Sequence, residues 1–480
     1  MISAPGNLSI RLLLLLTLAL FIFSCSSNKE QVADPPNIIF IFIDDMGYAD
    51  LGCYGNTEVH TPHIDHLAAE GIRLNQFYVN APICSPSRVA VTTGQYPSRW
   101  GITTFISGRS HNEARGIRDY LHLSAPSVAR ELQQNGYYTA HIGKWHMGGG
   151  RDVDDAPLVT EYGFDESVTQ FEGLGERYLA TYETLHLKDS TRSLEKRSAA
   201  LGFGPVHWAK RENFTRIFVD RTIDAIEHAR REEKPFYINL WPDDIHTPLE
   251  PPAELRGDLS TKARFLGVME EMDRQFGRLF NYIREYPSLY ENTLIIFTSD
   301  NGPDAEVNTA GHLRGVKTNL YEGGFREPFI AWWPSVIPQE KNGSVNEKSV
   351  VAGFDLPLIF LTAAGADIND SIAYDGENMY DAIAGISEPM REKPLFWMRP
   401  PDRPGYNGDN DPDLAVRKGP YKLLMDADGS NVQLYNILDD ETESHELSDQ
   451  LPEIASELES ALLDWYHHYP HTIDTTKITY

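Results

Sequence analysis

The fold of this 480-residue chain is set by the stretch Asn37-Ile38-Ile39-Phe40-Ile41-Phe42-Ile43, which is followed at once by Asp44-Asp45. Residues 38–43 are all β-branched or aromatic, and no polar residue interrupts them. A half-exposed strand would alternate apolar and polar side chains, whereas a strand of a parallel sheet is covered on both faces. The stretch therefore predicts a buried strand of a parallel sheet, with two carboxylates at its carboxyl end.

Shorter apolar runs further along the chain predict more of the same sheet. We expect strands at 137–142, 236–240, 294–298 and 329–333, and helices at 127–134, 214–231 and 262–284. Strands that alternate with helices are typical of an α/β fold with a large, mainly parallel sheet sandwiched by helices. Residues 172–208 follow neither period, and we expect them to form an irregular insertion over a site.

The pattern changes after about residue 389. Short runs from there on predict a small antiparallel sheet with strands at 395–398, 414–417, 422–425 and 433–437, and a helix is expected at 452–466. We therefore expect a catalytic domain, residues 36–388, and a smaller C-terminal α+β subdomain, residues 389–480. A loop rich in Pro and Gly, residues 400–410, separates the first two of these strands and is expected to be functional or disordered.

Residues 1–24 have the pattern of a signal peptide, because Arg11 precedes an apolar run that is too short to cross a bilayer. Cys25 follows that run and resembles the lipidation site of bacterial lipoproteins. Residues 25–35 would then be a tether, and the protein would be exported and anchored to a bacterial membrane, facing the periplasm or the cell surface. The alternative is an ordinary signal peptide that is cleaved near Cys25.

The charge of the chain limits its partners. The 70 acidic and 42 basic residues give a formal charge of −28, which disfavours nucleic acid and anionic membrane surfaces. We expect the lipid anchor to be the only contact with a membrane. The three cysteines, Cys25, Cys53 and Cys84, are too few for a disulfide framework.

Acidic pairs end two of the expected strands. Asp44-Asp45 follows the first strand, and Asp300-Asn301 follows the strand at 294–298. Adjacent buried carboxylates are costly unless a cation binds them, and ligands bind at the carboxyl edge of such a sheet. An all-oxygen set suits Ca²⁺ first and Mg²⁺ second, rather than Zn²⁺. The alternative is that each aspartate caps the turn that follows it.

A second group of residues is suited to an anion. Cys84-Ser85-Pro86-Ser87-Arg88 places Cys84 at a helix N-terminus, where backbone N–H groups favour negative charge, and Arg88 lies one turn further on. Lys144 and His146 alternate at a strand end, and with His246 and Lys317 they could hold a dianion and move protons. Taken singly, each is more often a buried thiol, a solvated cation or a hydrogen-bonded histidine.

Together these motifs resemble the type I sulfatases of the alkaline-phosphatase-like superfamily. The resemblance spans residue 36 to about residue 328. It is carried, in the family's order, by Pro36-Asn37-Ile38-Ile39 with Asp44-Asp45-Met46-Gly47, Cys84-Ser85-Pro86-Ser87-Arg88 with Thr93-Gly94, Gly143-Lys144-Trp145-His146, His246-Thr247-Pro248, Ser299-Asp300-Asn301-Gly302, Gly315-Val316-Lys317 and Tyr321-Glu322-Gly323-Gly324.

The resemblance implies that a maturing enzyme, of the formylglycine-generating or the anaerobic type, converts Cys84 to Cα-formylglycine. One hydroxyl of the hydrated aldehyde would attack sulfur, and the other would expel sulfate. The resemblance also implies a cation, Ca²⁺ or else Mg²⁺, whose ligands are Asp44, Asp45, Cys84, Asp300 and Asn301.

The resemblance assigns roles to the remaining residues as well. Arg88 and the metal would stabilise the attacking oxygen, and Lys144 and Lys317 would neutralise charge that develops on the sulfate and the bridging oxygen. His246 would protonate the leaving alcohol, and His146 would be the base for release of sulfate.

A sulfatase with a lipoprotein anchor resembles the bacterial type that desulfates polysaccharides, so we expect a sulfated oligo- or polysaccharide substrate. Two other functions stay open, namely a phosphoric or phosphonic ester hydrolase of the same superfamily and a non-catalytic binder of sulfated glycans. An aryl sulfate site would need a wider apolar wall. The candidates for contact with the sugar are Arg151, Asp152, Asp243, Asp244, Arg399, Arg403, Tyr406 and Asn407. The alternative for Arg151 is an ion pair with Asp154 or Asp155 in a surface turn.

Overall fold

The structure is a computed structural model that describes residue 1 and residues 34–183, 189–399 and 411–468. The chain from Pro36 onwards forms one compact unit, and the residues before it form a separate one. The predictions for the signal peptide, for a lipid on Cys25 and for most of the tether fall on residues 2–33, which lie outside the described residues. Among the described residues, no helix is long and apolar enough to cross a membrane.

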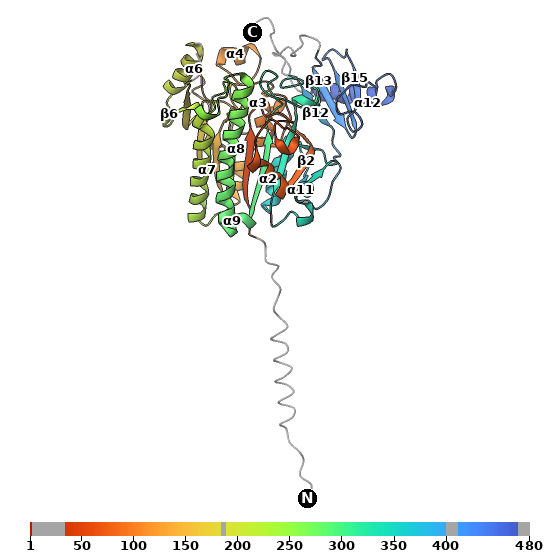
Figure 1. The fold of residues 1–480 in the computed structure, drawn as a ribbon. Coiled ribbons are helices and arrows are strands. Elements are labelled where there is room, and N and C mark those ends of the chain that lie inside the picture. The colour runs from red at the N-terminus through yellow and green to blue at the C-terminus, as the bar shows by residue number, and fades with distance from the viewer. Residues whose placement is uncertain (2–33, 184–188, 400–410, 469–480) are drawn as a thin grey trace. The chain divides into compact units, whose positions relative to one another are not determined.

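Strand β1 (Asn37–Ile43) lies in the interior of a large sheet, as its sequence predicts (Figure 1). It pairs in parallel with β7 (Phe236–Trp241) on one side and with β8 (Thr293–Ser299) on the other. The strand order is β10-β2-β9-β8-β1-β7-β3-β4-β5-β6, and β11 pairs with β2. Strand β9 (Arg326–Trp332) runs antiparallel to both of its neighbours, so the sheet is mainly parallel.

The remaining strands of this sheet are β2 (Ile72–Tyr78), β3 (Tyr138–Gly143), β4 (Glu166–Gln170), β5 (Glu176–Thr181), β6 (Val206–Lys210), β10 (Ser344–Asn346) and β11 (Val351–Ala352). The α-helices are α2 (Pro62–Glu70), α3 (Cys84–Thr93), α4 (Arg109–Ala114), α5 (Val128–Gln134), α6 (Asp189–Ala200), α7 (Phe214–Arg231), α8 (Thr261–Glu285), α9 (Pro287–Glu291), α10 (Leu356–Ala363), α11 (Tyr380–Ile383) and α12 (Pro452–His467). The alternation of strands with helices confirms the predicted α/β fold.

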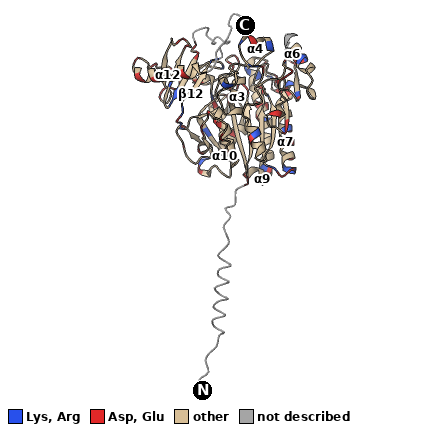
Figure 2. Cartoon of the chain, turned by 180° about the vertical axis from the view of Figure 1, so that it is seen from behind, with Lys and Arg blue, Asp and Glu red and all other residues tan. Residues whose placement is uncertain are grey.

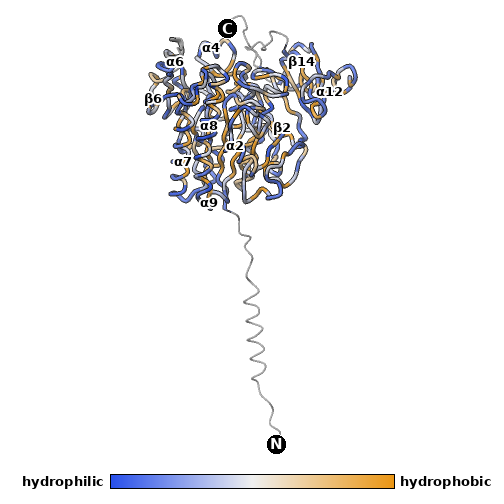
Figure 3. The backbone as a smooth tube through the Cα atoms, in the orientation of Figure 1, coloured by the Kyte–Doolittle hydropathy of each residue, from blue (hydrophilic) through white to orange (hydrophobic). Residues whose placement is uncertain are grey.

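Side chains of β1 point alternately into two helical layers. The odd-numbered residues of 39–43 belong to the core formed with α2, α7 and α8. The even-numbered residues of 38–42 belong to the core formed with α3, α5 and α10. Because both layers exclude water, every position from 38 to 43 must be apolar, which explains the unbroken run in the sequence. Hydrophobic and hydrophilic residues alternate along α7 and α8 (Figure 3), and charged residues are spread over the outer elements (Figure 2).

Residues 172–208 are not the irregular insertion that their sequence suggests. They contain β5, α6 and β6, and the two strands extend the sheet beyond β4 in parallel register. No residue of β6 is fully buried. Strands at the margin of a sheet are covered less completely, so polar residues interrupt their apolar runs and neither sequence period is visible.

The C-terminal residues form the predicted small antiparallel sheet with one helix. Its strands pair in sequence order, and α12 packs on them through a separate apolar core. The sheet also shares the core of the large sheet, since Trp397 stacks on Phe325 with the ring centroids 4.5 Å apart. The indole N–H of Trp397 donates to the carbonyl oxygen of Val79 at 2.7 Å. The four strands are β12 (Leu395–Met398), β13 (Leu414–Lys418), β14 (Tyr421–Met425) and β15 (Gln433–Asn436).

A buried ionic cluster joins the small sheet to the large one. Lys422 of β14 lies 2.9 Å from a carboxylate oxygen of Glu322 and 2.8 Å from one of Glu443, and all three side chains are fully buried. Burial would raise the pKa of Glu322, but Lys422 and Arg326 hold that pKa at about 2. Burial raises the pKa of Glu443 to about 7 against the attraction of Lys422. Lys422 is therefore one of two buried cations, with Arg326 at 3.4 Å, that neutralise an ionised Glu322.

We expect Lys422→Met to destabilise the protein by about 3–5 kcal/mol, because it leaves buried Glu443 without its ion-pair partner and Glu322 with Arg326 alone. Urea unfolding followed by circular dichroism measures this loss. Lys418→Met is the matched control, since Lys418 pairs with Glu457 on the surface, where both side chains are more than half exposed. Equal stability of the two variants would show that the cluster does not hold the sheets together.

Candidate active site

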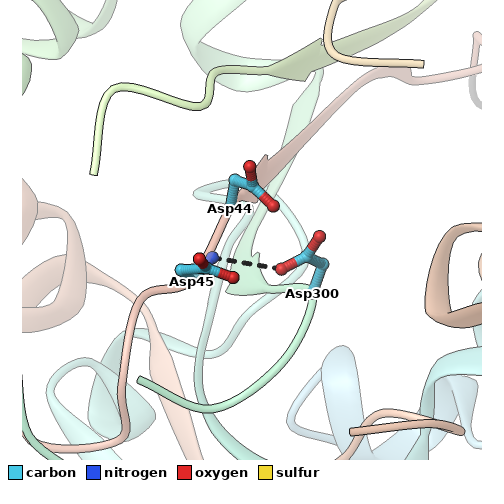
Figure 4. Close-up of side chains that lie close together, drawn as sticks. All are labelled: Asp44, Asp45 and Asp300. Atoms are coloured by element: carbon cyan, nitrogen blue, oxygen red, sulfur yellow. Dashed lines mark hydrogen bonds between the residues drawn. The ribbon is translucent and has the colours of Figure 1, made fainter. Parts of the chain in front are cut away.

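Three carboxylates meet at the carboxyl edge of the large sheet. Asp44 and Asp45 follow β1, Asp300 follows β8, and Ile43 lies opposite Ser299 in the ladder that joins the two strands. The left-handed backbone of Asp45, with φ of 63°, turns its N–H onto a carboxylate oxygen of Asp300 at 3.1 Å (Figure 4). All three side chains are buried, and each offers an oxygen within 4.8 Å of the others.

The chemistry of this oxygen group fits a hard divalent cation. The Asn301 amide donates its N–H to Asp45 at 2.8 Å, and its buried oxygen Oδ1 has no hydrogen-bond partner. Burial raises the pKa of Asp300 well above its usual range, and the neighbouring Asp44 carboxylate raises it further. A cation bound by these oxygens would relieve both the orphaned acceptor and the repulsion between carboxylates. Asp44, Asp45, Asp300 and Asn301 could therefore hold a metal ion.

Arg88 links the carboxylates to helix α3. Its guanidinium is fully buried and lies 2.6 Å from Asp300 and 3.3 Å from Asp44. It also donates to the carbonyl oxygen of Lys144 at 3.0 Å and lies over the ring of Trp241. All ten residues of α3 are buried, so the helix holds Arg88 in one place.

Cys84 begins α3, as the sequence predicts, and its side chain is buried. Burial alone would raise the pKa of this thiol, but His146, Lys144 and Lys317 lower it to about 5. The same electropositive surroundings would stabilise any anion bound beside position 84. The sulfur is not part of the oxygen group, and its role as a metal ligand stays a prediction.

The cationic and imidazole side chains predicted for the site come together around Cys84. Lys144, which follows β3, lies 2.6 Å from Asp44, and Lys317 lies 2.6 and 2.7 Å from the two oxygens of Asp45. His246 lies 3.7 Å from Asp45. Together with Arg88, the two lysines are three largely buried cations, and they pair with the three carboxylates of Asp44, Asp45 and Asp300.

These residues open onto a cavity of about 330 Å³. One wall consists of the predicted residues Cys84, Lys144, His146, His246 and Lys317. The rest of the lining comes from β4, β5, α6 and their connections, and sequence reasoning named none of its members individually. Its residues are Gln170, Phe171, Glu172, Ala180, Tyr182, Leu194 and Glu195, with Phe105 and Arg211 beside them. The sequence indicated this part of the cavity only through the expectation that residues 172–208 cover a site.

The residues predicted to contact the sugar have different positions. Arg151 and Asp243 line the cavity. Asp152 does not line it, because it accepts from the backbone N–H of Arg109 and pairs with Arg197.

Asp244 is not a lining residue either, because it is buried and accepts from the N–H of Thr215 at the start of α7. Arg399 pairs with Asp413 at 2.8 Å in the small sheet and is likewise absent from the cavity wall. Arg403, Tyr406 and Asn407 lie outside the described residues.

Asp154 and Asp155, the alternative partners considered for Arg151, pair with a different arginine. Arg109 pairs with Asp154 at 3.1 Å and with Asp155 at 2.6 Å, whereas Arg151 pairs with Glu172. Arg211 is a second cavity arginine, and it is committed to Asp243 at 2.6 Å.

A carboxylate cluster beside three cations and two imidazoles, at the carboxyl edge of an α/β sheet, suits an enzyme that binds an anionic ester beside a metal ion. Comparison with known proteins narrows the class. The family model described as Sulfatase matches residues 36–366. Arylsulfatase A of Homo sapiens is 31% identical over an alignment of 421 positions, which covers 83% of this chain and 76% of that protein.

Two further relatives cover almost the whole chain. N-acetylgalactosamine-6-O-sulfatase of Bacteroides thetaiotaomicron is 26% identical over 91% of this chain and 94% of its own length. The crystal structure of Ps i-CgsB in complex with k-i-k-neocarrahexaose has a TM-score of 0.76 and 27% identity, and the match covers 92% of this chain and 94% of that one. The chain therefore belongs to the sulfatase family, and the protein is an enzyme that hydrolyses sulfate esters.

Removal of divalent cations should lower the melting temperature, because a ligand that binds only the native state stabilises that state. At a ligand concentration one hundred times the Kd, this stabilisation is about 2.7 kcal/mol. Calorimetry before and after dialysis against a chelator, with elemental analysis, measures the effect. Asn301→Ala should show a smaller fall, since it lacks one oxygen. A chelated protein that is free of metal and melts unchanged would contradict the metal site.

Proposed function

We propose that this sulfatase removes sulfate from a sulfated carbohydrate, using a formylglycine made from Cys84 and a bound Ca²⁺, with Mg²⁺ as second choice. The proposal rests on one observation above all. Cys84, three cations and two imidazoles share one cavity with a carboxylate group whose oxygens fit a hard cation. A formylglycine-generating or anaerobic maturing enzyme would be the partner that modifies Cys84.

The cation would be held by Asp44, Asp45, Asp300 and Asn301 together with position 84. When present, the formylglycine and the cation supply the activated oxygen nucleophile that attacks sulfur. Arg88, Lys144 and Lys317 neutralise the charge of the sulfate group as it is transferred. Their burial strengthens this effect, because the cavity excludes most of the water that would screen them.

The two histidines are positioned for different proton transfers. Nδ1 of His246 lies 2.8 Å from the carbonyl oxygen of Thr247, so this nitrogen carries a proton, and Nε2 of the doubly protonated ring would donate to the leaving alcohol. His146 lies beside Cys84 in the same cavity, and its neutral imidazole would accept the proton that leaves position 84 when sulfate is released.

A carbohydrate substrate is supported by the relatives and by the polar part of the cavity wall. One relative is named an N-acetylgalactosamine-6-O-sulfatase, and one structure contains a neocarrahexaose. Arg151, Gln170 and Glu195 offer hydrogen-bonding groups in the wall. The wall also contains Phe105, Phe171 and Leu194, so apolar lining by itself does not separate a sugar site from the wider apolar wall expected of an aryl sulfate site.

We expect the best sulfated saccharide to exceed p-nitrophenyl sulfate in kcat/KM, because only a saccharide uses the polar wall. The test measures sulfate release from N-acetylgalactosamine 6-sulfate, carrageenan oligosaccharides and glycosaminoglycan oligosaccharides. Cys84→Ala should keep the melting temperature within a few degrees and lose all turnover. A peptide mass lower by about 18 Da at Cys84 reports conversion of the thiol to the aldehyde.

Faster turnover of the aryl sulfate than of every saccharide would overturn the carbohydrate assignment. Turnover by Cys84→Ala would overturn the formylglycine. A p-nitrophenyl phosphate or phosphonate ester hydrolysed faster than any sulfate would favour the phosphoric or phosphonic alternative, and binding of sulfated glycans without turnover would favour the non-catalytic binder.

We also propose that the enzyme is exported and anchored through a lipid on Cys25. The motive is the short apolar run that precedes this cysteine. Acyl chains on one terminus hold a protein to a membrane firmly when there are two or more. Wild type should enter the detergent phase in a partitioning assay and Cys25→Ser should not. Both proteins in the aqueous phase would reject the anchor.

A further inference from the structure

The turn that follows β3 has an unusual backbone. His146, Gly148, Gly149, Gly150 and Arg151 all have positive φ, with 53° at His146 and 51° at Arg151. Glycine adopts such angles freely, but a residue with a side chain is strained there by about 1–3 kcal/mol. Both strained residues line the active-site cavity, as does Lys144 at the start of the same turn. Neighbouring contacts must therefore hold both ends of the turn.

The carbonyl oxygen of Ile106 lies 3.1 Å from Nε2 of His146, and Glu172 contacts both strained residues. The side chain of Glu172 is 7% exposed, its Oε2 lies 3.0 Å from Nε2 of His146, and its Oε1 accepts from Nε of Arg151 at 2.7 Å. Glu172 also packs directly on the turn, because a Cβ at Gly150 would lie 3.2 Å from both its Cα and its Cγ. One carboxylate thus reaches a histidine and an arginine on either side of three glycines.

The two cavity arginines differ in what they can offer a substrate. Arg211 is 4% exposed and uses one terminal nitrogen for the Asp243 carboxylate at 2.6 Å and the other for backbone carbonyl oxygens of Asp243 and His246. Arg151 is 22% exposed and binds Glu172 through Nε. Within the described chain, the two terminal nitrogens of Arg151 have no protein partner, and its guanidinium lies over the ring of Phe171.

We propose that Glu172 is a positioning residue that holds His146 in place for proton transfer and directs the free edge of Arg151 toward oxygen atoms of the sugar. Proton transfer and sugar recognition are then coupled through one side chain. The inference rests on the proposed function, because it takes His146 as the base and the sugar as the leaving group. A guanidinium edge with two free donors suits a pair of sugar oxygens.

Glu172→Gln tests the proposal, since it removes the negative charge that faces both His146 and Arg151. We expect kcat to fall by about ten-fold to a hundred-fold with p-nitrophenyl sulfate and with the fastest sulfated saccharide, because both need His146 and a small misplacement of a catalytic group costs about that much. KM should rise for the saccharide more than for the aryl sulfate, because only the saccharide reaches Arg151.

Arg151→Ala separates the effect on sugar binding from the effect on proton transfer by His146. It should raise KM for the saccharide more than for p-nitrophenyl sulfate. Combined with Glu172→Gln, it should add little further rise in the saccharide KM, since both changes remove one contact. A merely structural role of Glu172 would instead make the losses in the double variant additive and equal for both substrates.

Glu176→Gln is the matched control. Glu176 also bridges a histidine and an arginine, His207 at 3.1 Å and Arg221 at 3.2 Å, but it does not line the cavity. Its substitution should leave kcat and KM unchanged. A crystal structure of Glu172→Ala gives a readout without activity, in which the side chains of His146 and Arg151 should leave their places.

Two results would overturn the inference, namely wild-type kinetics of Glu172→Gln and unmoved His146 and Arg151 in the Glu172→Ala structure. Wild-type protein that hydrolyses no sulfate ester would instead count against the proposed function. The crystal structure of Glu172→Ala would still decide the positioning role in that case.

Discussion

Everything in the active site depends on one balance of buried charge. Asp44, Asp45 and Asp300 sit at the carboxyl edge of the sheet, and each is paired with one of the cations Lys144, Lys317 and Arg88 at 2.6 Å. A single buried ion costs several kcal/mol, and its cost falls only when a partner of opposite charge lies at hydrogen-bond distance. The six side chains come from different elements, so the fold must bring β1, β8, α3 and the turn after β3 to one place.

This balance also explains why the site suits a sulfate ester. Three carboxylates and three cations leave the cluster close to neutral without a metal ion. On the proposed function, a divalent cation takes the carboxylate oxygens, and its own charge remains in excess beside position 84. The ammonium groups of Lys144 and Lys317 are then released from Asp44 and Asp45 and can face an anionic group in the cavity, which both residues line. The arrangement stabilises negative charge on transferred sulfate, which is where it grows during the reaction.

The sequence predicted the centre of the molecule better than its margin. The run at residues 38–43 is apolar at every position because two helical layers cover it, and its prediction as a buried strand is confirmed. Helix α7 was predicted with the bounds that the structure has. Strands β5 and β6 were missed because partial exposure admits polar residues, which hide the period.

The difference between a predictable centre and a less predictable margin also applies to the site. The groups proposed to act on sulfur were predicted from the sequence, whereas most of those that would surround the substrate were not. Asp44, Cys84 and Lys144 lie at ends of elements in the sheet centre, within short motifs that a family resemblance can carry. The ion-pair partner of Arg151 could not be predicted from such a motif. Asp154 and Asp155 are near in sequence, but the turn with three glycines carries Arg151 toward Glu172, and Arg109 takes the two aspartates instead.

Such a choice between partners is decided by backbone angles and by the docking of β4 against the turn, neither of which has a local sequence period. The wall of the cavity is built from margin elements, β4 to α6, whereas the sulfate-binding side is built from the core. On the proposed function, the groups that act on sulfur are therefore held by the fully buried centre of the fold, and those that face the sugar by its partly exposed margin.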